Sequence, residues 1–60
     1  MKVGDVVQLN SGGPVMTVKQ YPYSEKGFTY KDRAKCIWFD NTTTCEGIFP
    51  ISMLTIIKTV

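Results

Sequence analysis

The chain of 60 residues contains no histidine and only two cysteines, Cys36 and Cys45. Histidine is the commonest general base, and the acidic residues show no spacing typical of a catalytic carboxylate pair. A structural zinc site takes four ligands, so two cysteines without any histidine make a poor one. We therefore expect neither an enzyme nor a metal site, and no cofactor.

Long hydrophobic runs and a strong charge of one sign are missing as well. Seven Lys and Arg against five Asp and Glu give a net charge of +2, well short of the balance expected of a dedicated nucleic-acid binder. No stretch is apolar enough to span a membrane, and the N-terminal residues lack the apolar core and cleavage site of a signal peptide. We expect a cytoplasmic protein whose thiols stay reduced.

The length predicts a single domain, residues 1–60, of marginal stability. A chain this short hides only about 60% of the surface that its unfolded form exposes. Small scaffolds of this kind often depend on a disulfide, a metal or a partner chain. The composition, 43% apolar and 20% charged, is nevertheless that of a folded protein and not of a disordered one.

Strand patterns run through the whole chain, and no segment of eleven residues shows a helical period. The segment 21–31 contains Pro22, Ser24 and Gly27, which indicates a loop or a splayed hairpin tip. A 3-10 turn is expected over 50–53, before the last strand. Five short strands with turn-rich connections predict an all-β fold, a small five-stranded barrel. The expected strands are 5–9, 15–20, 33–40, 43–49 and 54–58.

Alternation along these strands separates an inner from an outer face. The opposite face of strand 33–40 carries Arg33 and Lys35 but also Ile37 and Phe39, and the last strand leaves Ile57 on its outer side. A partner subunit is the simplest cover for such apolar residues, although a face assignment shifted by one strand would make them core. The expected inner residues are Val7, Leu9, Met16, Val18, Ala34, Cys36, Trp38, Leu54 and Ile56.

A family resemblance covers nearly the whole chain. The segments Val3–Val7 and Ser11–Pro14, followed by Met16–Val18, resemble the N-terminal signature of the YodC-like family of small uncharacterised bacterial proteins. Cys36–Phe39 and Phe49–Pro50, with Leu54 behind them, fall where that family has its C-x-W-F and F-P-x-x-x-L elements. The resemblance implies an SH3-like barrel and no activity. Residues 21–31 are longer and more aromatic than the hairpin tip typical of the family.

That aromatic segment is the main candidate for binding. Its rings, Tyr21, Tyr23, Phe28 and Tyr30, lie among the cations Lys19, Lys26, Lys31 and Arg33. Flat rings stack on bases and cations meet phosphates, as in single-strand and nucleotide binders. Tyrosine is equally common in protein contacts. The rings would also serve simply to cover the open end of a barrel.

Two further features carry weaker hypotheses. The turn Ser11-Gly12-Gly13 offers backbone N–H groups that could hold an anion, but it lacks the spacing of a phosphate-binding loop and serves equally as a tight turn. The cysteines face each other only if the hairpin turns at Asp40-Asn41; a turn at Asn41-Thr42 makes them diagonal neighbours.

We therefore expect a non-enzymatic binding module that forms a small homo-oligomer, with Ile37, Phe39 and Ile57 at the interface. One alternative is the sequestration of a nucleotide signal, as some small phage-encoded proteins do, and another is a nucleic-acid-binding barrel. The expected ligand is a protein or a small anionic or aromatic molecule. The residues expected to bind it are Tyr21, Tyr23, Phe28, Tyr30, Lys31, Arg33 and Trp38.

Overall fold

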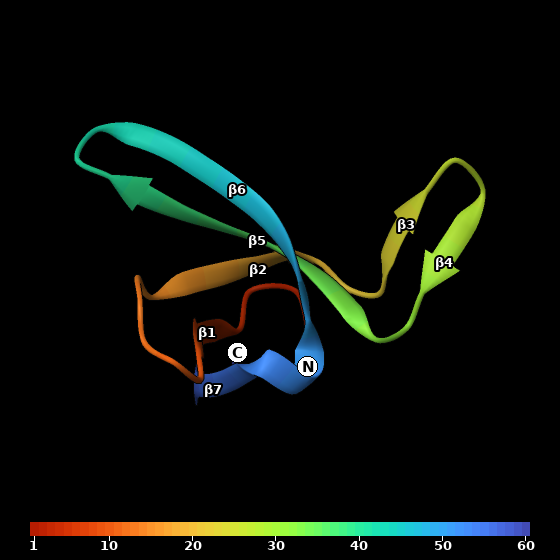
Figure 1. Cartoon of the computed structure of the whole chain (residues 1–60), viewed down its shortest axis with the longest axis horizontal. Helices are drawn as coiled ribbons and strands as arrows, with labels where there is room; N and C mark the ends of the chain where they lie inside the picture. The colour runs from red at the N-terminus through yellow and green to blue at the C-terminus, as the bar shows by residue number, and fades with distance from the viewer.

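Seven β-strands and one 3-10 turn make up the computed structural model, which describes all residues from 1 to 60. Five strands form one antiparallel sheet in the order β6-β5-β2-β1-β7, and β3 pairs with β4 in a separate hairpin (Figure 1). The elements in chain order are β1 Val6–Leu9, β2 Met16–Gln20, β3 Tyr23–Glu25, β4 Phe28–Tyr30, β5 Arg33–Asp40, β6 Thr43–Pro50, η1 Ile51–Met53 and β7 Leu54–Lys58.

The sheet is open, so the expectation of a closed barrel is wrong. β6 and β7 are its two edges, and they do not pair with each other. β5 and β6 have eight residues each, whereas β1 has four and β7 has five. The long β5–β6 hairpin runs past the short strands (Figure 1), and β7 pairs with β1 alone. The 3-10 turn before the last strand is confirmed at Ile51–Met53.

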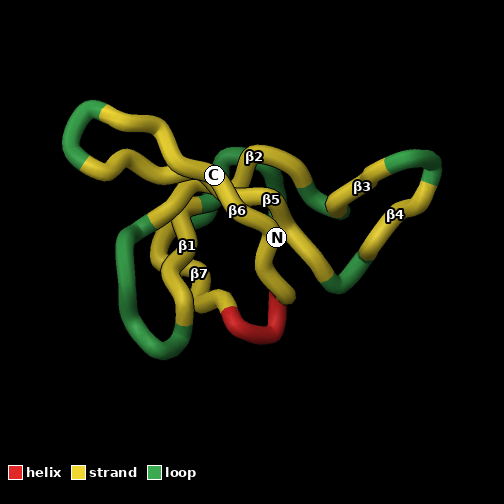
Figure 2. Tube along the Cα trace, turned by 45° about the horizontal axis from the view of Figure 1, so that its top comes forward, coloured by secondary structure: helices red, strands yellow, loops and turns green.

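Residues 23–30, expected to be a loop or a splayed hairpin tip, form a regular two-stranded ribbon. Lys26 and Gly27 connect its strands with positive φ values of 51° and 85°. Two successive residues in this conformation are typical of the type I′ turn, whose twist matches that of a tight hairpin. The hairpin projects away from the five-stranded sheet (Figure 2). It therefore offers a surface that the sheet does not cover.

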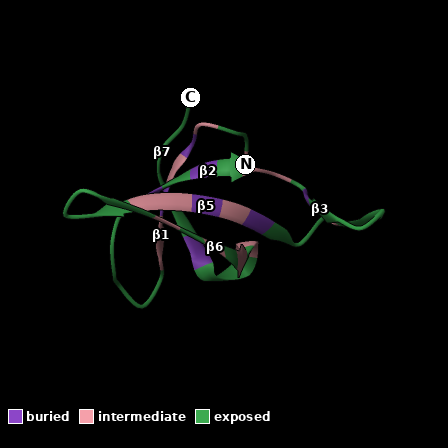
Figure 3. Cartoon of the chain, turned by 90° about the horizontal axis from the view of Figure 1, so that it is seen from above, coloured by how far each residue is buried: buried purple, intermediate pink, exposed green.

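The predicted core is largely confirmed. Along β5, buried and less buried residues alternate (Figure 3), as expected for a strand with one covered face. Leu9 and Trp38 are partly buried and pack against the core. Ile56 pairs with the buried Val7 and so lies on the inner face as predicted, but it is 42% exposed, because it lies on the edge strand β7, which has a neighbour on only one side. The buried cluster is Val7, Met16, Val18, Ala34, Cys36 and Leu54.

Asp5 is a buried residue that the sequence did not single out. Its carboxylate accepts hydrogen bonds from the Val60 N–H (N···Oδ1 3.0 Å) and from the Lys2 N–H (N···Oδ2 2.9 Å), and its carbonyl accepts one from the Val18 N–H at 2.9 Å. The two N–H groups on the carboxylate hold the pKa of Asp5 below its usual value. Asp5 thus joins both ends of the chain to β2 and has a structural role.

The β5–β6 hairpin settles the relation of the two cysteines. It turns at Asn41-Thr42, with Asn41 at φ 58°, and pairs Cys36 with Gly47 and Trp38 with Cys45. The cysteines are therefore diagonal neighbours, and both are free thiols. Burial raises the pKa of Cys36, so this thiol is a poor nucleophile.

Candidate functional site

Three aromatic rings share one face of the β3–β4 hairpin, which we call the aromatic face and define as Tyr23, Phe28 and Tyr30. The register pairs Tyr23 with Tyr30 and Glu25 with Phe28, and residues two apart in a strand point to the same side. The two tyrosine rings stack, with centroids 6.0 Å apart and an interplanar angle of 22°. Tyr23 is buried, whereas Phe28 at the tip is 67% exposed. The aromatic face therefore has an anchored base and an exposed end.

Arg33 completes the aromatic face with a cation. Its guanidinium carbon lies 4.6 Å from the centroid of the Tyr30 ring, within the range of a cation–π contact. Arg33 is the first residue of β5, directly after the hairpin. The Tyr21 hydroxyl donates a hydrogen bond of 2.9 Å to the carbonyl of Lys31. This bond joins the two ends of the hairpin and fixes where it leaves the sheet.

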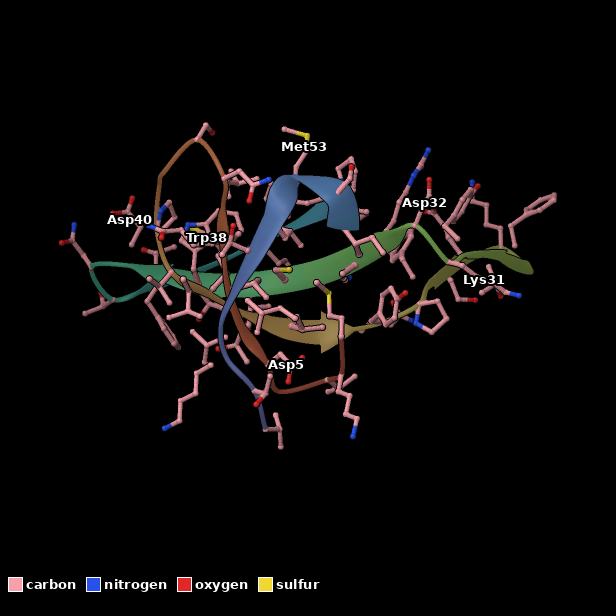
Figure 4. All side chains as sticks on the ribbon, turned by 90° about the horizontal axis from the view of Figure 1, so that it is seen from below. Asp5, Lys31, Asp32, Trp38, Asp40 and Met53 are labelled. Atoms are coloured by element: carbon pink, nitrogen blue, oxygen red, sulfur yellow. The ribbon has the colours of Figure 1, made fainter.

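The structure thus brings six of the seven predicted ligand-binding residues to the hairpin and its base, and it does not bring Trp38 there. Trp38 packs against Phe49, with ring centroids 6.1 Å apart, and contacts the core. Trp38 and Lys31 lie at opposite ends of the molecule (Figure 4). Gly47 lies beneath the Phe49 ring, where an added Cβ would be 3.0 Å from the ring. Trp38 is therefore part of the packing of the β5–β6 hairpin.

The three residues expected at an oligomer interface do not form one patch. Ile37 and Phe39 lie on β5, and Phe39 is largely exposed, whereas Ile57 lies on β7 at the opposite edge of the sheet. Ile48 of β6 is 44% exposed and pairs with Lys35, so it lies on the same outer face as Ile37 and Phe39. Ile48 was not among the predicted interface residues; the register of the β5–β6 hairpin is the signal that identifies it.

Three charged side chains on this outer face form an ion-paired cluster within the chain. The Nζ atoms of Lys19 and Lys35 both lie 3.4 Å from Oε2 of Glu46. Hydrogen bonds from Lys35 and then Lys19 hold the pKa of Glu46 below its usual value. The three side chains come from β2, β5 and β6, three adjacent strands. Glu46 is therefore ionised at neutral pH and paired with two cations of its own chain.

The glycine turn uses some of its polar groups internally. Gly12 and Gly13 both have positive φ values, 104° and 112°. The Gly12 N–H donates to the carbonyl of Leu9 at 2.9 Å, and the Gln8 side chain donates to the carbonyl of Gly13 at 2.7 Å. The Gly12 N–H is thus not free for an anion, and the local bonding is that of a tight turn between β1 and β2.

The candidate site is an exposed surface. The structure contains no pocket and no group of three or more His, Cys, Asp or Glu side chains placed to hold a metal ion. It also contains no helix long and apolar enough to cross a membrane. The residues that remain available for recognition lie on the projecting hairpin and on the outer face of the sheet.

Comparison with known proteins gives a family. The sequence model of the uncharacterised small proteins DUF2158 matches residues 2–54, which include the aromatic hairpin and all strands except most of β7. No curated protein and no solved structure matches the chain. The chain therefore belongs to the DUF2158 family of uncharacterised small proteins.

Proposed function

We propose that this protein is a non-enzymatic binding module that recognises a partner protein through the aromatic face of the β3–β4 hairpin. The observation that carries the proposal is the shared face of Tyr23, Tyr30 and the largely exposed Phe28, with the Arg33 guanidinium over Tyr30. Aromatic residues and arginine are enriched at protein interfaces, since they offer a large contact area with few rotatable bonds.

The hairpin is held in place before any partner arrives. An isolated two-stranded hairpin is only marginally stable in water, but here Tyr21 packs against the core and donates a hydrogen bond to Lys31 across the base of the hairpin, and Tyr23 is buried. A surface that is ordered in the free protein loses less conformational entropy on binding. This preorganisation supports a recognition role for the projecting tip.

The proposal includes self-association and an SH3-like arrangement with an open sheet. The strand order β6-β5-β2-β1-β7 and the 3-10 turn before β7 support the SH3-like arrangement. The exposed side chains of Phe39 and Ile48, with the half-buried Ile37 on the same face, support self-association. The cytoplasmic location stays a prediction from the sequence.

A peptide selection tests the proposal. Peptides that bind the immobilised, folded protein are selected from a displayed random library. The affinity of each selected peptide is then measured by titration with the wild type and two variants. We expect Phe28→Ala to weaken binding at least about tenfold, the loss typical of an interface anchor. Thr29→Ala is the matched control, because Thr29 is an exposed neighbour on the opposite face of the same hairpin. Peptides that bind Phe28→Ala as well as the wild type would refute the assignment of the aromatic face.

A nucleotide or single-stranded nucleic acid is the second candidate, favoured by the stacking of Arg33 on Tyr30 beside the exposed Lys31. Base stacking and phosphate contacts would use the same residues. Thermal unfolding with linear and cyclic nucleotides tests it, since a ligand at 100 times its Kd adds about 2.7 kcal/mol of stability. Binding of a labelled oligothymidine should also fall steeply with salt. No stabilisation and no binding at low salt would remove this candidate.

A further inference from the structure

The outer edge of β6 is an eight-residue strand paired on one side only, with β5. An unpaired strand edge presents a row of N–H and C=O groups that another strand can bind. Which residues of β6 present them follows from the hydrogen bonds of the sheet, and this decides what the edge can pair with.

The hydrogen bonds of Val18 show which residues of β6 turn their backbone groups toward β5 and which turn them outward. The Val18 N–H donates to the carbonyl of Asp5, and its carbonyl accepts from the N–H of Gly4, both at 2.9 Å, so its backbone groups point toward β1 and away from β5. Cys36, the partner of Val18 in β5, therefore bonds to Gly47 on its other side. Hydrogen-bonded and non-bonded pairs alternate along an antiparallel ladder. The backbone groups of Thr44, Glu46 and Ile48 consequently point out to the free edge.

This edge lacks the protection that natural edge strands usually carry. In natural proteins, exposed charged residues (often lysine), prolines or β-bulges commonly keep an edge strand from pairing with another chain. The one charged residue on β6, Glu46, is ion-paired with Lys19 and Lys35 of its own chain. Pro50 stands only at the end of the strand, and Ile48 is 44% exposed beside the outward backbone groups. The edge is therefore long, carries a single charged residue and is partly apolar.

We propose that β6 pairs with β6 of a second copy of this chain, antiparallel and centred on Gly47, to give one continuous sheet across a two-fold dimer. The inference rests on the self-association included in the proposed function and names its interface. The same edge on both copies makes the contact isologous, as a two-fold axis requires. This pairing gives the outward N–H and C=O groups of β6 protein partners.

The register follows from geometry and charge. An outward residue must oppose an outward residue, so near the middle of β6 the axis can lie at Cys45, Glu46, Gly47 or Ile48. An axis at Ile48 aligns only residues 46–50. An axis at Cys45 aligns only the residues 43–47 of β6. An axis at Glu46 sets the two glutamates opposite each other, and directly opposed like charges are destabilising. An axis at Gly47 aligns residues 44–50 and sets Glu46 opposite Ile48 of the second copy.

In this register the pairs of outward residues add about six backbone hydrogen bonds between the two copies. The number is not larger because the proline at position 50 of each copy has no N–H to donate. The two Ile48 side chains become diagonal neighbours on the outer face, within reach of each other. Within the second copy, Lys35 pairs with Ile48, and this Ile48 lies opposite Glu46 of the first copy. Lys35 of the second copy and Glu46 of the first therefore lie on either side of the same isoleucine. The contact thus combines backbone pairing, apolar burial and complementary charge.

Charge substitutions at Ile48 test both the edge and the register. Ile48→Glu should not destabilise the monomer, because residue 48 faces Lys35 in the same chain. In the dimer, however, the new carboxylate lies opposite Glu46 of the second copy, and this happens in both symmetric contacts. Ile48→Lys places a cation opposite Glu46 of the second copy. Sedimentation equilibrium of each variant gives the dimer dissociation constant, and circular dichroism confirms that each variant is folded. Ile57→Glu is the matched control, a comparably exposed isoleucine (52%) on the opposite edge.

We expect the wild type, Ile48→Lys and Ile57→Glu to be dimers, and the dissociation constant of Ile48→Glu to rise at least about tenfold. Equal weakening by Glu and Lys would overturn the Gly47-centred register, since residue 48 would then not face Glu46. A dimer that only Ile57→Glu disrupts would refute the β6 interface and leave self-association intact. A wild-type monomer at millimolar concentration would refute both, while the peptide titrations with Phe28→Ala still decide the role of the aromatic face.

Discussion

Replacing Met16 by alanine tests how few side chains hold this fold together. Met16 is the largest of the fully buried side chains, only 2% exposed, in a core cluster of six residues. Alanine removes three heavy atoms and leaves a cavity that the neighbouring strands fill only in part. Substitutions of this kind cost about 2–5 kcal/mol. A single core in a chain of this size rarely supplies more than about 3–5 kcal/mol in total, so the substitution should remove between about two fifths and all of the stability.

Urea unfolding followed by the fluorescence of Trp38 measures this loss. Trp38 is the single tryptophan, and it packs against the core. With a slope of about 1 kcal/mol/M for a small protein, the midpoint of Met16→Ala should fall by about 2 M or more. All variants are compared at one protein concentration, because self-association would otherwise shift the midpoint by mass action.

Val15→Ala is the control, because Val15 is the preceding residue, apolar and exposed. Surface substitutions of this kind usually change stability by less than about 0.5 kcal/mol. If Met16→Ala is entirely unfolded, Met16→Leu still tests the argument, since a volume-conserving exchange should cost less than about 1.5 kcal/mol. A loss of stability for Met16→Ala no greater than that for Val15→Ala would refute the assignment of the inner face.

Three other predictions follow from local features. Asp5→Asn should destabilise the protein at neutral pH but not in acid. The folded protein lowers the pKa of Asp5, so the ionised carboxylate stabilises the fold fully above the ordinary carboxyl pKa of about 3.9. This stabilisation is lost as the pH falls through the pKa of Asp5 in the folded state. A stability difference between wild type and Asp5→Asn that is as large at pH 2 as at neutral pH would contradict this prediction. Alkylation at pH 8 should label the partly exposed Cys45 and spare the buried Cys36 until urea unfolds the chain; equal rates in the native state would show that β5 is not packed. Lys26→Asn should slow amide exchange in β3 and β4, because Asn before Gly27 suits a type I′ turn better, and faster exchange would refute that turn.

The candidate site was only partly predictable from the sequence. The clustering of aromatic and basic residues in 21–33 is visible in the sequence, and it pointed to the hairpin. Which rings share a face was not visible, because it depends on the register of two strands of only three residues each. Runs so short show no alternation, and the positive φ values of Lys26 and Gly27 set the pairing.

Trp38 and Ile57 show what composition leaves open when strand pairing is unknown. Both are apolar residues in well-predicted strands, and both were assigned to functional surfaces. Trp38 instead packs on Phe49 within the β5–β6 hairpin, and Ile57 lies on the edge opposite Ile37. Ile48 took no part in the predictions, although the hairpin register sets it opposite Lys35, on the same face as Ile37 and Phe39.

The sequence by itself determined the all-β class, the five strands of the main sheet and the members of the core, because side-chain alternation is a local signal with a period of two residues. Only the tertiary structure decided that the sheet stays open, that β6 has a free edge and that Asp5 is buried. These features depend on which strands pair and how far each runs past its neighbour, and strand pairing joins residues distant in the chain. The shortness of β1 and β7 beside β5 and β6 leaves one long edge unpaired.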